Sequence, residues 1–526
     1  MIRRALISVT DKAGVVEFAK GLVEEGFSIL STGGTMKAIR GAGIEVEEVA
    51  DYTGFPEMMD GRLKTLHPKV HGGLLARRDV EGDVDSMAEH GIDRIDLVAV
   101  NLYAFRATAQ RPGVSRAEVV ENIDIGGPTM IRSAAKNHQH VAVVVDPADY
   151  EAVLAALRDN DGELPVEMRR DLAGKAFAHT ASYDTAIGGW FAEERAQRAD
   201  QARFGGDFGL AGEKVQDLRY GENPQQQAAF FRNPDADAPN LASATQLSGK
   251  ELSYNNILDL DAAMGVALDF EAPTCAVIKH LNPCGTATAA NGERAFRAAL
   301  AADPVSAFGG IVALNVTLTS AIAQAMSDEA GFLEAIIAPG VDEDALAILQ
   351  AAKWGKNVRI MDLGGYPPAD EQVLLRQVSG GFLLQTYLPG FLHDEKNVVT
   401  KAHPNDLQLG CMDFAMRVCK HVKSNAILLA VAHDDGAFAT VGVGAGQMSR
   451  VDSVKIAVEK AGDKAVGAVM ASDAFFPFAD GLEAAIAAGV TAVIQPGGSK
   501  RDDEVIAAAD AAGVVMIFSG TRHFRH

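Results

Sequence analysis

The chain has 526 residues, of which 48% are hydrophobic and 22% are charged, and its formal net charge is −22. Because a single core stops growing at roughly 250–300 residues, we expect at least two domains and three or four structural units. So acidic a chain lacks the basic face that nucleic acid or an anionic membrane requires, but it can bind a small anion in one local basic pocket.

The cysteines and the N-terminus indicate the cellular compartment of the protein. Four cysteines without a C-x-x-C pair exclude a zinc ribbon and a thioredoxin-type motif, and they suit a reducing cytosol. The N-terminal apolar run is short and is interrupted by Asp11 and Lys12, so we expect no signal peptide. No apolar run reaches the ~18 residues of a membrane helix. These features predict a cytoplasmic protein without a membrane partner.

Strand and helix patterns alternate over the first 150 residues. Residues 5–9 and 27–30 read as strands, whereas residues 14–25 and 35–43 carry apolar side chains at helical spacing. Residues 95–103 and 140–146 are further buried strands, and residues 151–191 have a helical pattern. This alternation predicts an α/β domain with a parallel sheet.

A change of composition marks the domain boundary. Residues 192–214 are charged and then rich in glycine, so we place the boundary near residue 200 and divide the chain into domains 1–195 and 200–526. Residues 275–340 and 426–498 of the second domain follow one plan of strand, polar turn, helix and a Phe-Gly or Phe-Pro turn. We interpret this plan as a tandem duplication.

Two polar segments follow predicted strands of the first domain. The segment "STGGT" (residues 31–35) opens a helix, and its small residues leave backbone N–H groups free to bind phosphate. The segment "SVTDK" (residues 8–12) ends the first strand at the same sheet edge, where ligands bind in such folds. A glycine-rich turn without a ligand is the alternative. Neither a G-x-G-x-x-G nor a G-x-x-x-x-G-K-[ST] fingerprint is present, so we expect no dinucleotide site and no P-loop.

A basic segment, residues 60–78, stands out in this acidic chain. Its lysines, arginines and histidines, with His-Pro and His-Gly turns, predict an irregular anion-binding loop, unless the segment is only solvated surface. Asn101 and Tyr103 follow a strand, and Asp124 precedes a Gly-Gly-Pro turn and a helix that carries Lys136. Such groups beside a phosphate pocket suit proton transfer and oxyanion stabilisation.

In the second domain, "AVIKHLNPCG" (residues 276–285) places Lys279 and His280 at the end of a strand. A chance pair at a surface turn is the alternative. On a regular strand the two side chains face opposite ways, but a turn at Pro283 and Gly285 can bring both towards one pocket. A neighbouring ammonium disfavours the imidazolium, which leaves His280 uncharged and able to act as a general base.

Nine motifs occur in order along the whole chain: "STGGT", "GRLKTLHPKVHGGLLARR", "ENIDIGGPTMIRSAAKN", "LRYGENPQQ", "IKHLNPCG", "SNAI", "GAGQMSR", "SDAFFPFAD" and "TRHFRH". Together they resemble the bifunctional purine-biosynthesis family in which AICAR formyltransferase is joined to IMP cyclohydrolase. The motifs are long and mutually independent, so the resemblance is specific.

For the N-terminal domain, the resemblance implies a methylglyoxal-synthase-like fold that cyclises formyl-AICAR to IMP with loss of water and without a cofactor. It assigns catalysis to Lys64, Tyr103, Asp124 and Lys136. It assigns nucleotide binding to Ser8, Lys12, Thr32, Gly33, Thr35, Arg62 and Thr65, to which the strand-end position adds Asn101 as a candidate.

For the C-terminal domain, the resemblance implies a duplicated cytidine-deaminase-like α/β fold without zinc, which transfers a formyl group from 10-formyltetrahydrofolate to AICAR. It assigns catalysis to Lys279, His280 and Asn425. It assigns substrate binding to Arg219, Tyr220, Glu334, Arg450, Arg522 and Phe524, and folate binding to Phe475 and Asp480. It also implies a homodimer, while the acidic composition predicts no nucleic-acid partner.

Two positions depart from the family pattern. Glu334 stands where the family has an aspartate: the carboxylate is kept but is one methylene longer, so the sequence leaves open whether it keeps the contact with the nucleotide. Cys284 stands where a smaller residue is common, and we interpret it as a packing residue.

Competing interpretations are weaker. A zinc deaminase needs H-x-E followed by P-C-x-x-C, and here the two halves are reversed and incomplete, so we expect no catalytic metal. Phe475, Phe476 and Phe478 form either a wall for the pterin or plain core. Two alternative functions stay open. The first is an enzyme of this build that keeps only one of the two activities. The second is a non-catalytic nucleotide sensor, but a sensor would not need a general base, because phosphate binding alone does not require one.

Overall fold

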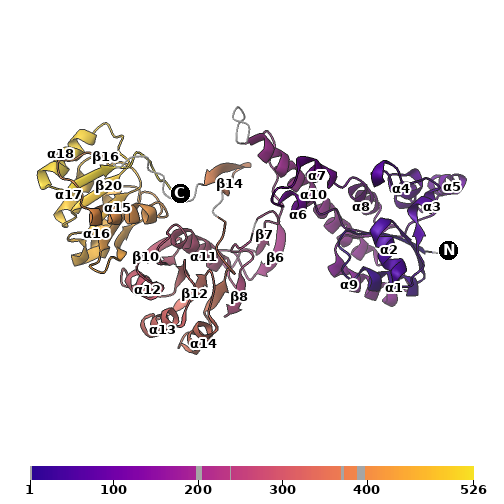
Figure 1. The fold of residues 1–526 in the computed structure, drawn as a ribbon, viewed down its shortest axis with the longest axis horizontal. Coiled ribbons are helices and arrows are strands. Elements are labelled where there is room, and N and C mark those ends of the chain that lie inside the picture. Colours follow the sequence, from indigo (N-terminus) through magenta and orange to yellow (C-terminus); the bar gives the residue numbers. More distant parts are fainter. Residues whose placement is uncertain (1–2, 197–203, 237, 369–371, 388–396) are drawn as a thin grey trace. The chain divides into compact units, whose positions relative to one another are not determined.

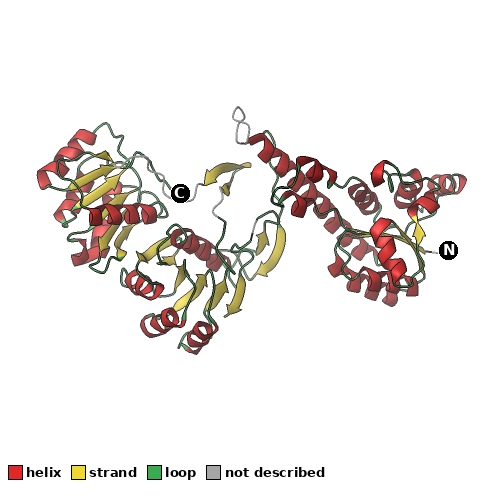
Figure 2. Cartoon of the chain, viewed as in Figure 1, coloured by secondary structure: helices red, strands yellow, loops and turns green. Residues whose placement is uncertain are grey.

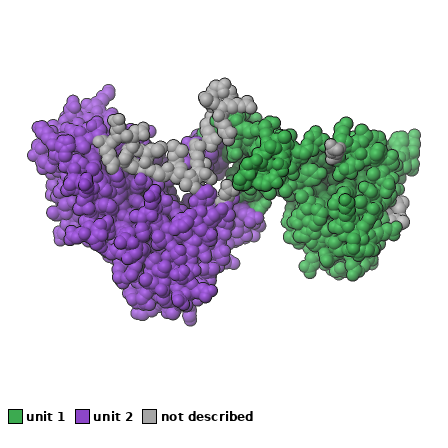
Figure 3. Space-filling view, viewed as in Figure 1, with its two compact units in different colours: residues 1–213, 233–235 green, residues 214–232, 236–526 purple. Residues whose placement is uncertain are grey.

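A computed structural model of the chain describes residues 3–196, 204–236, 238–368, 372–387 and 397–526. The chain forms two compact units (Figures 1 and 3): residues 1–213 with 233–235 make unit 1, and residues 214–232 with 236–526 make unit 2. The boundary that we predict near residue 200 falls in residues 197–203, which lie outside the described residues.

Unit 1 is built on a five-stranded sheet in the order β3-β2-β1-β4-β5, and every neighbouring pair is parallel. Side chains alternate across it, so Leu6 of β1 lies in one core while Ala5 and Ile7 lie in the core on the other face. Helices α1, α2 and α9 complete the core around Ala5 and Ile7, and α4, α8 and α10 complete the other. The predicted parallel α/β sheet is confirmed.

The strands of unit 1 are β1 (Arg3–Ser8), β2 (Phe27–Ser31), β3 (Glu47–Glu48), β4 (Leu97–Val100) and β5 (Ala142–Val144). Its helices are α1 (Val15–Glu24), α2 (Gly33–Gly41), α3 (Val49–Thr53), α4 (Pro68–Leu75), α5 (Glu81–Glu89), α6 (Phe105–Ala109), α7 (Arg116–Glu121), α8 (Gly126–Lys136), α9 (Tyr150–Asp159) and α10 (Val166–Ala196), with short 3-10 helices η1 (Met59–Gly61) and η2 (Pro147–Asp149).

The basic segment at residues 60–78 differs from the prediction, because Pro68–Leu75 forms the regular helix α4. Two local features start this helix. Pro68 has no N–H to satisfy in the first turn, and Nδ1 of His67 accepts a hydrogen bond from the Lys69 amide at 3.1 Å. The segment is therefore irregular only up to His67.

Unit 2 contains one twelve-stranded sheet in the order β16-β21-β20-β19-β17-β18-β10-β9-β11-β12-β13-β8. Read outward from its middle, the first half runs β10-β9-β11-β12-β13-β8 and the second runs β18-β17-β19-β20-β21-β16. Each half has the same chain order of strand, helix, hairpin, helix, strand, helix, strand, helix and strand. The predicted tandem duplication is confirmed, but the halves share one sheet instead of forming separate units.

The first half comprises β8 (Thr245–Ser248), α11 (Tyr254–Ala267), β9 (Thr274–Lys279), β10 (Asn282–Thr288), α12 (Gly292–Leu300), β11 (Gly310–Leu314), α13 (Ser320–Glu329), β12 (Leu333–Ala338), α14 (Glu343–Ala351) and β13 (Arg359–Asp362). The second half comprises β16 (Asn397–Val398), α15 (Asp406–Cys419), β17 (Ile427–Ala432), β18 (Phe438–Gly444), α16 (Arg450–Ala461), η3 (Gly462–Ala465), β19 (Val469–Ser472), α17 (Asp480–Ala487), β20 (Ala492–Gln495), α18 (Asp502–Ala512) and β21 (Val515–Phe518).

Helices cover both faces of the large sheet (Figure 2). Helices α11 and α15 lie on one face and pack in a single core that contains strand residues of both halves. On the other face, α12–α14 and α16–α18 form one core in each half. Two two-stranded sheets that the sequence patterns did not indicate lie outside this sheet: β6 (Glu213–Leu218) with β7 (Ala228–Arg232), and β14 (Gln372–Val378) with β15 (Gly381–Tyr387).

None of the helices in the described part of the chain combines the length and the apolar character needed to cross a membrane.

Candidate active sites

Polar side chains gather where β1, β2 and β4 of unit 1 end. The hydroxyls of Ser8 and Thr32 lie 3.1 Å apart, and the buried Thr35 hydroxyl accepts from the Val9 amide at 3.0 Å and donates to the Val9 carbonyl at 2.9 Å. Asn101 accepts from the amides of residues 10 and 11 through its side-chain oxygen, at 2.6 and 3.1 Å. The three strand ends are thereby tied into one polar edge.

Two lysines flank the start of α2 at this edge. A Cβ built on Gly33 would lie 3.8 Å from Nζ of Lys64, and one built on Gly34 would lie 3.6 Å from Cε of Lys12. Gly33 also has a φ of 48°, a left-handed conformation that favours glycine. The N-terminus of α2 and two ammonium groups thus face the same space, which suits a phosphate group.

Three of the four predicted catalytic residues of unit 1 lie close to one another. The Asp124 carboxylate accepts from the Gly127 amide at 2.8 Å and from the Tyr103 amide at 3.3 Å. Burial raises the pKa of Asp124. Burial also raises the pKa of the Tyr103 phenol, Asp124 raises it further, and the nearby Lys64 lowers it.

Lys64 itself has a partner that the sequence did not indicate. Its Nζ lies 2.7 Å from Oε1 of Glu57, which follows α3. Thr65 is also placed here, since a Cβ on Gly126 would lie 2.8 Å from its hydroxyl. The arrangement offers a cation, a phenol and a carboxyl group with a raised pKa beside a phosphate cradle.

The structure does not bring Lys136 to this group. Lys136 ends α8, which begins at Gly126, two residues after Asp124, so about 15 Å of helix separates it from the others. The helix returns the chain from the end of β4 to the start of β5, so Lys136 lies at the opposite edge of the sheet.

Other parts of the basic segment are also dispersed. Arg62 forms an ion pair with Glu121. Arg77 pairs with Asp83, and Arg78 pairs at 2.8 Å with Asp96, which precedes β4 at the opposite edge of the sheet. The prediction of one anion-binding loop over residues 60–78 is therefore wrong, and only its first part borders the polar edge.

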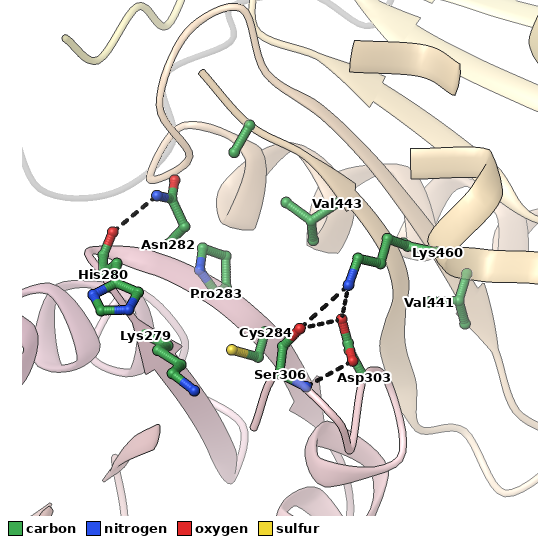
Figure 4. Close-up of a pocket in the computed structure, with 12 residues that line it drawn as sticks. Lys279, His280, Asn282, Pro283, Cys284, Asp303, Ser306, Val441, Val443 and Lys460 are labelled. Atoms are coloured by element: carbon green, nitrogen blue, oxygen red, sulfur yellow. Dashed lines mark hydrogen bonds and ion pairs between the residues drawn. The ribbon is translucent and has the colours of Figure 1, made fainter. Parts of the chain in front are cut away.

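In unit 2, Lys279 ends β9 and His280 begins a two-residue turn into β10. They line a cavity of about 360 Å³ between the two halves, to which the second half contributes Val441–Val443 of β18 and Lys460 of α16 (Figure 4). The Lys279 ammonium donates to the Phe308 carbonyl at 2.7 Å, while His280 is exposed. Lysine and histidine therefore border a common cavity.

The opposite wall of this cavity joins the halves through an ion pair. Nζ of Lys460 lies 2.8 Å from Oδ2 of Asp303 and 3.3 Å from the Ser306 hydroxyl (Figure 4). Cys284 also lines the cavity, but burial raises the pKa of its thiol to about 12, so a thiolate is not available for chemistry.

The second half contributes a buried polar cluster before β17. Asn425 accepts from the Arg450 guanidinium at 2.8 Å and donates to the Gln447 carbonyl at 2.9 Å. Arg450 also forms an ion pair at 2.6 Å with the buried Asp473, which follows β19. Asn425 is thereby fixed in position by the Arg450 side chain of α16 and by the backbone of the loop after β18.

Two hydrogen bonds through Asn282 connect the Lys279–His280 turn with Lys423, which lies two residues before Asn425. The Lys423 amide donates to the side-chain oxygen of Asn282 at 3.1 Å, and the Asn282 amide group donates to the His280 carbonyl at 3.0 Å. Since β9 and β10 form an antiparallel pair and β10 runs antiparallel to β18, the turn and the loop after β18 lie at the same edge of the sheet.

The remaining predicted contacts of unit 2 are more spread out. Glu334 is on β12, two strands away from Lys279 of β9. Its carboxylate forms an ion pair with Arg359. Arg219 lies over the ring of Tyr220, with 4.8 Å from its Cζ to the ring centroid, after β6.

At the C-terminus, Arg522 lies over Phe524 in the same way at 4.4 Å. The His523 amide between them donates to the Asp473 carbonyl at 2.9 Å, so the tail is tied to the Asn425 cluster.

Some aromatic residues after β19 belong to the core, and others are exposed and could form the wall for the pterin. Phe476 is fully buried in the core of the second half, whereas Phe475 and Phe478 are 38% and 50% exposed. Asp480 is the first residue of α17. A pterin wall could thus include Phe475 and Phe478 but not Phe476.

Residues that the sequence patterns missed include Glu57, Lys460 and Asp259. Asp259 stands on α11 between Leu258 and Leu260, and a carboxylate between apolar residues was the available signal. Within the described residues, no group of three or more His, Cys, Asp or Glu could hold a metal ion.

Comparison with known proteins decides the family. Residues 134–460 match the family model of the AICARFT/IMPCHase bienzyme, and residues 14–129 match that of the MGS-like domain. The chain belongs to the AICARFT/IMPCHase family. The resemblance noted in the sequence is therefore confirmed, including an N-terminal methylglyoxal-synthase-like domain.

Relatives in this family match the chain from end to end. The bifunctional purine biosynthesis protein PurH of Desulfitobacterium hafniense is 52% identical over 530 residues, with 100% of each chain covered. PurH of Roseobacter denitrificans is 52% identical over 540 residues, covering 100% of this chain and 99% of the relative. A crystal structure of ForH is 42% identical and covers 36% of this chain and 100% of that chain, with a TM-score of 0.34.

As a family member, the chain is a bifunctional enzyme of purine biosynthesis, an AICAR formyltransferase and IMP cyclohydrolase that acts on small-molecule substrates. The transferase reaction uses 10-formyltetrahydrofolate as its formyl donor.

Proposed function

We propose that the two activities are divided between the two units, with ring closure of formyl-AICAR in residues 1–195 and formyl transfer to AICAR in residues 200–526. The meeting of both halves of unit 2 at the Lys279–His280 turn carries this proposal, because Lys279 and His280 of the first half and Lys460 of the second half line one cavity there.

For ring closure, the carboxamide nitrogen attacks the formyl carbon, and the former carbonyl oxygen leaves as water. Lys64 donates to that oxygen as negative charge develops on it, and Tyr103 is a second donor. Asp124 has a raised pKa and exchanges the proton of the attacking nitrogen. Ser8, Lys12, Thr32, Gly33, Thr35, Arg62, Thr65 and Asn101 bind the nucleotide around the start of α2. Lys136 lies at the other edge of its own sheet, so we assign it no step here.

For formyl transfer, the aromatic amine of AICAR is a weak nucleophile because its lone pair is conjugated with the ring. His280 takes the amine proton as the new C–N bond forms. Lys279 or Asn425 then stabilises the oxyanion until tetrahydrofolate leaves. Phe475 and Asp480 contact the folate, and Arg219, Tyr220, Glu334, Arg450, Arg522 and Phe524 contact AICAR.

Two variants test the assignment in the full-length chain. With AICAR and 10-formyltetrahydrofolate, His280→Ala should form no tetrahydrofolate by absorbance, yet it should cyclise supplied formyl-AICAR at the normal rate. Lys64→Ala should show the converse. If either variant loses both activities while remaining folded, or keeps the one that it should lose, the division is wrong.

We further propose a cytoplasmic homodimer without nucleic-acid or membrane partners. The family resemblance supports the dimer. The net charge of −22 supports the absence of polyanionic partners, since a broad basic face is needed for them.

A further inference from the structure

The turn that carries His280 has an unusual backbone. β9 and β10 are joined by only two residues, His280 and Leu281, and Lys279 pairs directly with Asn282. Their φ values are 54° and 65°, so both are in the left-handed region. Two-residue hairpin turns of this kind favour Asn-Gly, because side chains other than glycine are strained there. Histidine adopts this conformation more often than most residues other than glycine do, but leucine rarely does, so the strain is greatest at Leu281.

One carboxylate compensates for this strain. Asp259 of α11 accepts from the His280 amide at 3.1 Å through Oδ2 and from the Leu281 amide at 2.7 Å through Oδ1. Both oxygens are engaged, one with each strained residue. Hydrogen bonds to a charged acceptor are stronger than those between neutral groups, so they favour this turn over alternatives in which the amides point elsewhere.

The duplication supplies an internal comparison. Helices α11 and α15 begin with equivalent capping boxes, at Ser253 and Asn405, and the position six residues later is Asp259 in α11 and the buried Cys411 in α15. The corresponding β17–β18 connection has five residues, 433–437, and includes Gly436 with a φ of 83°. The half with a relaxed turn therefore has no carboxylate at this position, and the half with the strained turn has one.

We propose that Asp259 is a positioning residue for formyl transfer, which holds the left-handed turn and so aims His280 at the amine of AICAR. This proposal rests on the role of His280 proposed above. Asp259 does not need to touch substrate. A displacement of the base by about 1 Å is enough to slow a positioned reaction by roughly 10²-fold.

The variant Asp259→Ala should therefore lower kcat for formyl transfer by roughly 10²-fold, with a change in the KM for AICAR of less than about threefold. Ring closure of supplied formyl-AICAR should be unchanged. Adding Leu281→Gly should restore at least about tenfold of the lost kcat, because glycine adopts the left-handed conformation without strain. If Asp259 acted only on stability, the losses caused by Asp259→Ala and by Leu281→Gly would add in the double variant.

Asn291→Ala is the matched control. The Asn291 side chain also accepts from a backbone amide, that of Arg294 at 2.9 Å, but it caps α12 beyond the other end of β10. This variant should lose stability without losing kcat.

The outcomes separate the two proposals. If His280→Ala is inactive but Asp259→Ala keeps kcat within twofold, the positioning role is wrong. If Leu281→Gly deepens the loss in the double variant, it is also wrong. If His280→Ala remains active, the proposed base fails instead. Should Asp259→Ala not fold, Asp259→Asn with and without Leu281→Gly gives the same comparison, since asparagine retains one acceptor oxygen.

Discussion

A buried histidine should make the stability of unit 2 depend on pH well above the range of its carboxylates. His421 is buried with Nε2 3.2 Å from Oδ2 of Asp269, and Lys420 and Arg525 also face it. Burial lowers the pKa of His421 from 6.5 to about 4, and the two neighbouring cations add to this, although Asp269 opposes it.

The sign and the size follow from these two values. Between pH 6.5 and 4 the unfolded chain binds a proton that the folded chain excludes, so the free energy of unfolding falls as the pH falls. A difference of 2.5 units, from 6.5 to about 4, corresponds to about 3 kcal/mol. Asp269 titrates in a different pH range. Burial alone would raise its pKa, but hydrogen bonds from His421 and Lys420 hold the pKa at about 2. Its contribution to the free energy of unfolding is therefore lost only below about pH 4.

The measurement is urea unfolding between pH 7 and 4. The chain has two tryptophans, and Trp354 is buried in unit 2, so its fluorescence in a Trp190→Phe background reports on that unit. In His421→Gln, which retains a donor for Asp269 but does not titrate, the loss of stability between pH 6.5 and 4 should be about 3 kcal/mol smaller. Equal pH profiles for the parent and His421→Gln would refute the reasoning.

Three further predictions concern packing and the site edges. Gly442→Ala should lower the free energy of unfolding of unit 2 by about 3 kcal/mol, measured in urea, because its Cβ would lie 2.0 Å from the Ala457 carbonyl oxygen; full stability would contradict the clash. Phe475→Ala should raise the KM for 10-formyltetrahydrofolate with little change in stability, whereas Phe476→Ala should lower the free energy of unfolding by about 3–5 kcal/mol. The reverse pattern would contradict the assignment of Phe475 to the pterin wall and of Phe476 to the core. Thr35→Val should destabilise unit 1 by about 1–3 kcal/mol in thermal unfolding, since it removes both hydrogen bonds to Val9, which follows β1. An unchanged midpoint would count against that tie.

Local patterns in the sequence predicted those features that depend on residues close together in the chain. The parallel sheet, the duplication and the position of Lys279 and His280 at a strand end follow from periodicity and turn residues. The placement of Lys136 beside Asp124 failed because a crossover helix carries its end to the far edge of the sheet. That outcome depends on three-dimensional direction, which spacing along the chain does not encode.

The missed Asp259 and the undecided aromatic segment have two other causes. Asp259 acts on a turn that begins 21 residues later, and that turn contains no glycine to mark its left-handed backbone. Phe476 and Phe475 are adjacent and chemically identical, so only the direction of each side chain separates core from surface.

The junction of β10 and β18 has a consequence for how this protein can be dissected. Among the residues that the structure describes, two pairs connect the halves as strand partners, Ala287 with Ala439 and Thr288 with Phe438. A truncation between the halves would leave one of these strands as an open edge, whose free N–H and C=O groups would recruit strands from other chains. Expressed alone, each half should therefore aggregate instead of behaving as an autonomous module, although its own strand order would be intact.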